Sequence, residues 1–204
     1  MDSKSTSEKL AKQRELIGDF FIQFDRAISS IPFLIPQIVF PINITKEQNV
    51  NIETLLAGMN AHQLKVKFDS LIIDNFKDQA ELIQLNKKLS NKTTKLIEIR
   101  NSFAHGSYRI GWSNFSGEIS ENTFSLKHSK ETKTGYEKRS KIHTTKELEK
   151  LIYQEHQIYS CYMQIAAIFD TIAMDNDISI FIENLRLQIE KIGIIKFEHE
   201  SILN

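Results

Sequence analysis

Cysteine is nearly absent from this sequence, which has one, Cys161, among its 204 residues. A single cysteine excludes an internal disulfide framework and favours a reducing compartment. Its neighbours are apolar and aromatic, so we expect an inert core thiol rather than a nucleophile. The six histidines show no zinc-ligand spacing, and Walker and GxGxxG loops are missing, so the sequence predicts no metal site and no cofactor.

Net charge is also absent, because 26 lysines and arginines balance 26 aspartates and glutamates. No global field therefore draws the protein to nucleic acid or to an anionic membrane, and any contact with a polyanion must be local. Hydrophobic residues at 41% and charged residues at 25% are typical of a folded globular protein. We expect one packed domain over residues 1–204.

Long hydrophobic runs are missing as well. The longest, residues 31–44, holds all three prolines of the chain and is too short to cross a bilayer. The first residues lack the apolar core and the small-residue cleavage site of a secretory signal. We expect a cytoplasmic protein with no membrane partner, and an extended connector over residues 31–41.

Apolar residues at helical spacing predict a mainly α fold, an antiparallel helical bundle. Residues 107–143 instead mix aromatic, β-branched, glycine and polar residues, which predicts a small β-hairpin insertion or three short strands. Helices are expected over residues 5–30, 51–76 with a break at 58–60, 78–105 with a stop at Gly106, 144–173 opened by a capping box, and 177–192 ended by Gly193.

The helix expected over residues 78–105 carries an apolar seam at alternating three- and four-residue spacing, which Lys92 interrupts, and Arg100 lies near the edge of this seam. The segment RNSFAHG, residues 100–106, ends this helix and contains the chain's strongest candidate site. Arg100 is a permanent cation, Asn101 is an amide, and His105 exchanges protons near neutrality. Successive helix residues are displaced by about 100°, so Arg100 and His105 diverge by about 140° on a continuing helix. We expect Gly106 to end the helix and redirect His105.

These residue types suit RNA cleavage by the 2′-hydroxyl. A base takes the hydroxyl proton, an acid protonates the leaving oxygen, and a cation stabilises the charge on phosphorus oxygens. His105 can transfer one proton, Arg100 can supply the cation, and Asn101 can orient the phosphate. One histidine covers one transfer, so two subunits would complete the set. Alternatively, Arg100 and His105 simply satisfy the last carbonyls and the negative end of the helix dipole.

The segment RNSFAHG resembles the Arg-x4-to-6-His motif of HEPN (higher eukaryotes and prokaryotes nucleotide-binding) domains, in which asparagine commonly follows the arginine. The resemblance extends to a long helix ending in the motif, a β-like insertion and a capped helix, over roughly residues 51–173. In a subgroup whose members are modified, a tyrosine stands two residues after the histidine; here Ser107 stands there, a departure from that subgroup.

The resemblance implies a helical homodimer that meets across residues 100–105, with Arg100 and His105 as catalytic pair and Asn101 in support. It implies a metal-independent endoribonuclease acting on RNA in a toxin or phage-defence system, with a cognate antitoxin as partner. Other family members are catalytically inactive and bind nucleotides or proteins, which is the alternative reading of this chain.

Two further features of the sequence are candidates for a functional role. Residues 127–146 hold seven basic and two acidic residues, which suits either an RNA backbone or a solvated loop. Glu155 interrupts an apolar seam and is expected either to pair with Arg100 or, more simply, to be exposed. The candidate RNA-binding residues are Lys127, Lys130, Lys133, Lys138, Arg139 and Lys141.

Overall fold

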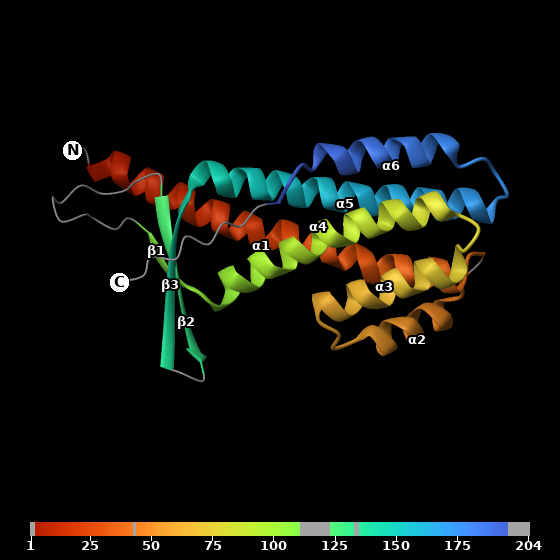
Figure 1. Cartoon of the computed structure of the whole chain (residues 1–204), viewed down its shortest axis with the longest axis horizontal. Helices are drawn as coiled ribbons and strands as arrows, with labels where there is room; N and C mark the ends of the chain where they lie inside the picture. Colours follow the sequence, from red (N-terminus) through yellow and green to blue (C-terminus); the bar gives the residue numbers. More distant parts are fainter. Residues whose placement is uncertain (1–2, 43, 111–122, 133–134, 196–204) are drawn as a thin grey trace. The chain divides into compact units, whose positions relative to one another are not determined.

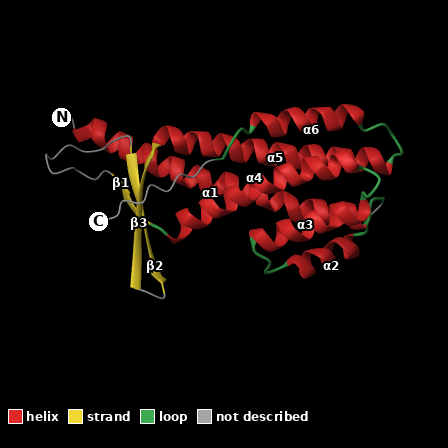
Figure 2. Cartoon of the chain, in the orientation of Figure 1, coloured by secondary structure: helices red, strands yellow, loops and turns green. Residues whose placement is uncertain are grey.

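The computed structural model describes residues 3–42, 44–110, 123–132 and 135–195. The fold is mainly helical (Figures 1 and 2). The helices are α1 (Ser3–Val39), α2 (Lys46–Leu56), α3 (Ala61–Asn75), α4 (Ala80–His105), α5 (Thr145–Ala173) and α6 (Ser179–Lys191). The strands β1 (Ser107–Ile110), β2 (Thr123–Thr132) and β3 (Gly135–Thr144) form an antiparallel sheet in the order β1-β2-β3.

The chain divides into two compact units that share the helices α1, α4 and α5. Unit 1 comprises residues 1–22, 98–153 and 196–204, and unit 2 comprises residues 23–97 and 154–195. The expectation of one domain over residues 1–204 stays a prediction. Within the described part of the chain, no helix is both long and apolar enough to span a membrane.

Helix α1 passes through Pro32 and Pro36, so the extended connector expected over residues 31–41 is wrong. A proline inside a helix costs about 3 kcal/mol, whereas burying one large aliphatic side chain stabilises by about 1.5–3 kcal/mol. Burial of several such side chains offsets the two prolines. The apolar residues buried along this part of α1 are Ile31, Leu34, Ile35 and Ile38.

Two serine hydroxyls of α1 bond to backbone carbonyls just before the first proline. Pro32 has no N–H to donate to the preceding turn. Ser29 Oγ donates to the Arg26 carbonyl at 3.1 Å, and Ser30 Oγ donates to the Ala27 carbonyl at 2.6 Å. Their acceptors are the carbonyls of residues 26 and 27, whereas the carbonyl that loses its N–H donor to Pro32 is that of Ile28. Hydroxyl bonds of this kind often accompany a bend in a helix.

Helices α2 and α3 are separated by the predicted break, and each begins with a capping box. Thr45 and Gln48 cap α2 through reciprocal bonds of 3.2 and 2.8 Å between side chain and backbone. Asn60 and Gln63 cap α3 in the same way at 3.0 and 2.9 Å. Gly58, in the break, has a φ of +82°, which favours glycine.

The predicted apolar seam of α4 is confirmed. Its members Leu82, Leu85, Leu89, Leu96, Ile99 and Phe103 are all buried. Lys92, the polar interruption of this seam, donates from Nζ to the Gly193 carbonyl just after α6. Partial burial lowers the pKa of Lys92 from its ordinary value. Within unit 2 this contact ties the middle of α4 to the end of α6.

The predicted ends of α5 and α6 are also found. Thr144 Oγ accepts from Glu147 N at 3.2 Å while Thr144 N donates to the Glu147 carboxylate at 2.7 Å, so the predicted capping box opens α5. Gly193 follows α6 with a φ of +68°, as expected of a terminating glycine. Cys161 on α5 is buried, and burial raises the pKa of its thiol to about 12, so the thiol is inert.

Gly106 follows α4 directly, but its backbone is not in the left-handed region expected at this position; among the described glycines, only Gly58 and Gly193 have positive φ. Glycine is required here for space instead. A Cβ atom at residue 106 would lie 2.2 Å from Leu126 Cδ1 and 2.9 Å from the Ser102 carbonyl oxygen. The end of α4 and strand β2 therefore approach each other too closely for a side chain at this position.

We expect Gly106→Ala to lower the free energy of unfolding by about 1–3 kcal/mol, because overpacking forces side chain and backbone to move. Gly18→Ala is the matched control, since Gly18 lies inside α1 with nothing within 4 Å of an added Cβ. Alanine there should stabilise the protein by up to about 1 kcal/mol through helix propensity. Urea denaturation measures both; equal effects of the two substitutions would contradict the close approach at Gly106.

Candidate functional site

The end of α4 is anchored to α1 within unit 1 by an aromatic pair. Phe103 and Phe20 are fully buried, and their ring centroids lie 4.7 Å apart. Phe20 in turn meets Phe21, its neighbour in α1, in an edge-to-face arrangement with centroids 5.6 Å apart. Such pairs add about 0.5–1.5 kcal/mol to the burial of their area. The last turns of α4, which carry the RNSFAHG segment, are thereby held by a rigid contact.

Arg100 lies at the rim of this aromatic contact, one turn before Phe103. Its side chain is half-buried, as its position at the edge of the apolar seam predicts, and the Nε atom is buried. The guanidinium carbon Cζ lies over the Phe21 ring, 5.8 Å from the centroid. A cation at this distance is attracted by the negative face of the ring. The arginine is therefore a partly desolvated cation held against α1.

Asn101 and His105 are both exposed. Since they are four residues apart, they are displaced by only about 40° around the α4 axis and share a face. His105 is consequently accessible to a ligand or to a second protein chain, with Asn101 beside it. Because His105 is exposed, its imidazole is not buried against the last carbonyls of the helix.

Helix α4 continues through His105, so the expectation that Gly106 redirects His105 out of helical geometry is wrong. The chain leaves helical geometry only at Gly106, after the histidine. Arg100 and His105 therefore keep the divergence of about 140° that an uninterrupted helix gives. The structure brings His105 to the side of Asn101, and it leaves Arg100 on a different side of α4.

The candidate RNA-binding residues lie on the two long strands, β2 and β3, except Lys133, which is outside the described residues. Directly paired residues and every second residue along a strand belong to one face of a sheet. The register pairs Leu126 with Lys141, His128 with Arg139, and Lys130 with Glu137. The positions of Lys130, Arg139 and Lys141 therefore share one face of the ladder, and those of Lys127 and Lys138 belong to the other.

Glu155 on α5 is fully buried in unit 2, so the simpler expectation of surface exposure is wrong. Neither carboxyl oxygen has a hydrogen-bond partner among the described residues. Burial, together with the negative charge of Asp25, raises the pKa of Glu155 to about 10. The group is therefore a neutral carboxylic acid at pH 7. Its pairing with Arg100 stays a prediction.

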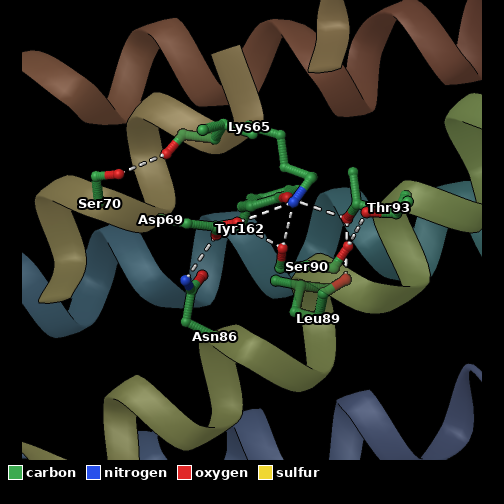
Figure 3. A network of polar contacts seen from close by, with 10 residues as sticks. Lys65, Asp69, Ser70, Asn86, Leu89, Ser90, Thr93 and Tyr162 are labelled. Atoms are coloured by element: carbon green, nitrogen blue, oxygen red, sulfur yellow. Dashed lines mark hydrogen bonds and ion pairs between the residues drawn. The ribbon is translucent and has the colours of Figure 1, made fainter. Parts of the chain in front are cut away.

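Sequence reasoning missed a buried polar network in unit 2 (Figure 3). The Lys65 ammonium on α3 donates to Asp69 Oδ2 at 2.9 Å and to Ser90 Oγ on α4 at 2.7 Å. Ser90 Oγ donates to the same carboxylate oxygen at 2.5 Å, and Asn86 Nδ2 donates to Asp69 Oδ1 at 2.9 Å. The spacing of four residues between Lys65 and Asp69 was the one local signal of an ion pair.

A second polar contact extends this network from α4 to α5. The hydroxyls of Thr93 and Tyr162 lie 3.0 Å apart, and Thr93 Oγ also donates to the Leu89 carbonyl at 3.0 Å. Burial raises the pKa of Tyr162. Because the Lys65 ammonium is paired with the Asp69 carboxylate, the arrangement fits helix registration better than catalysis.

A scan against models of protein families, a search of curated proteins and a search of solved structures each returned no match.

Proposed function

We propose that this protein is a metal-independent endoribonuclease of the HEPN type, acting in the cytoplasm in a toxin or phage-defence role. The observation that supports the proposal is the arrangement at the end of α4. A partly desolvated arginine is held against an aromatic ring, and an exposed histidine with a neighbouring amide follows one turn later. Those three groups supply charge stabilisation, proton transfer and orientation for attack on a phosphodiester.

The proposed reaction begins with attack of the RNA 2′-hydroxyl on the adjacent phosphorus. Neutral His105 Nε2 or Nδ1 accepts the hydroxyl proton, and a proton from solvent goes to the departing 5′-oxygen. The Arg100 guanidinium stabilises the negative charge that gathers on the non-bridging oxygens. The products are a 2′,3′-cyclic phosphate and a 5′-hydroxyl. DNA lacks the attacking hydroxyl and is not a substrate for this route.

The geometry of α4 supports an active site shared by two copies. Within one chain, Arg100 and His105 diverge by about 140° around the helix axis. A two-fold axis beside this helix would let the exposed His105 of one copy face the arginine of the other, because an isologous interface presents the same residues from both sides. The proposed active form is accordingly a homodimer across residues 100–105.

The proposed function implies two binding partners for the protein, RNA and an antitoxin. The RNA backbone would lie along the positions of Lys130, Arg139 and Lys141, which share one face of the β2–β3 ladder. A cognate antitoxin would block the exposed end of α4. The second candidate function is a catalytically inactive module that binds a nucleotide or a protein, and the divergence of Arg100 from His105 in a single chain favours it if the protein is monomeric.

Incubation of the purified protein with an RNA oligonucleotide in EDTA tests the proposed function. We expect fragments that end in 2′,3′-cyclic phosphate, no cleavage of the matching DNA, and retention of activity after exhaustive chelation. Size-exclusion chromatography with light scattering on the same sample gives the oligomeric state. Intact RNA together with a monomeric protein that binds nucleotides would favour the inactive module instead.

A further inference from the structure

Two adjacent phenylalanines of α1 contact the end of α4 in different ways. Phe20 is fully buried against Phe103, whereas Phe21 is half-buried and carries Arg100 over its ring. Neighbouring positions of a helix are displaced by about 100°, so one ring enters the core of unit 1 while the other lies on its flank. The aromatic pair thus fixes where Phe21 meets α4.

We propose that Phe21 is a positioning residue, which holds the Arg100 guanidinium in the orientation that receives the reacting phosphate. This inference rests on the proposed ribonuclease function. Arginine has a long, flexible side chain that loses conformational entropy when it binds an anion. A ring that orders the guanidinium before RNA binds removes part of that loss from the reaction.

The chemistry of the contact suits this task. A ring attracts a cation through its quadrupole and does not cancel the positive charge, as a carboxylate would. The Phe20 ring contacts the Phe21 ring edge to face, at an interplanar angle of 70°. Phe103, Phe20, Phe21 and Arg100 consequently form one continuous chain of contacts between α4 and α1.

Nuclear magnetic resonance tests the positioning without any assay of activity. The Arg100 Nε–Hε signal, assigned by its loss in Arg100→Lys, should be displaced by the ring current of Phe21, and the buried Nε should slow exchange of its proton. Phe21→Leu should abolish the displacement and Phe21→Tyr should keep it. Phe33→Leu is the matched control, since Phe33 is an exposed phenylalanine of the same helix, in unit 2.

The wild-type protein itself should show a nuclear Overhauser effect between the Phe21 ring protons and Arg100 Hδ. This measurement decides the matter even if Phe21→Leu fails to fold. An absent Overhauser effect, or an Arg100 signal that is unchanged in a folded Phe21→Leu variant, would overturn the proposal.

Cleavage kinetics supply the second readout. Phe21→Leu should lower kcat by about 2- to 30-fold, the range expected for loss of one cation–ring contact, with little change in KM. Phe21→Tyr should restore most of the rate, and Phe33→Leu should leave it unchanged. A loss that tyrosine does not restore would overturn the positioning role. If the wild-type protein cleaves no RNA, the proposed function fails, whereas the Arg100 signal still decides whether Phe21 holds the guanidinium.

Discussion

Replacing His105 by alanine is expected to lower the rate of RNA cleavage in EDTA by about 10²- to 10⁴-fold, the usual contribution of a general acid or base. The substitution removes the one imidazole of the segment RNSFAHG and therefore the proton transfer assigned to it. Because His105 is exposed, we expect the folded structure to be unaffected, within about 0.5 kcal/mol of free energy of unfolding. Initial rates on a fluorescent RNA oligonucleotide measure the effect.

The matched control is His62→Ala. His62 is also exposed, but it lies on α3 in unit 2, away from the RNSFAHG segment in the sequence. This variant should cleave RNA at the wild-type rate. If His105→Ala cleaves as fast as His62→Ala, the assigned role of His105 in proton transfer is wrong. A folded but inactive Arg100→Lys variant would add support, because an ammonium keeps the charge but lacks the planar fork of donors.

Asp69→Ala is expected to lower the free energy of unfolding by about 3–5 kcal/mol, because it leaves the buried Lys65 ammonium without its counter-ion. The Asp69 carboxylate accepts hydrogen bonds from Lys65, Ser90 and Asn86, and the Lys65 side chain is 9% exposed. Both the charge and two further donors lose their acceptor. Chemical denaturation followed by circular dichroism measures the loss.

Two variants show whether this loss comes from the network. Asp74→Ala changes an exposed aspartate of the same helix and should alter stability by less than about 0.5 kcal/mol. Adding Lys65→Met to Asp69→Ala removes the uncompensated charge and should recover part of the stability. A loss in Asp69→Ala that is no larger than in Asp74→Ala would mean that the network contributes little to folding.

The elements that depend on local rules could be predicted from the sequence. The period of the apolar residues placed the buried seam of α4 and left Arg100 at its edge, where the side chain is half-buried. Capping residues marked the start of α5, and Gly193 marked the end of α6. Each of these signals lies within a few residues of the feature that it predicts.

The features that depend on tertiary contacts were predicted wrongly or missed. The prolines of α1 favour a break locally, but burial of neighbouring apolar side chains outweighs that preference. Gly106 signals a helix end, but glycine is required at this position because Leu126 of β2, twenty residues later in the sequence, leaves no space for a side chain. The hydrogen-bond partners that Lys65 and Asp69 have outside α3 lie on α4, and no local sequence pattern in α3 predicts them.

Catalysis in a mixture of two inactive variants tests the shared site most directly. Arg100→Ala and His105→Ala, each inactive alone, would be mixed in equal amounts, allowed to exchange subunits, and assayed on RNA in EDTA. If each site takes its arginine from one copy and its histidine from the other, half of the dimers regain one intact site of two, and about a quarter of the wild-type activity returns. A mixture that contains mixed dimers but stays inactive would contradict the shared site.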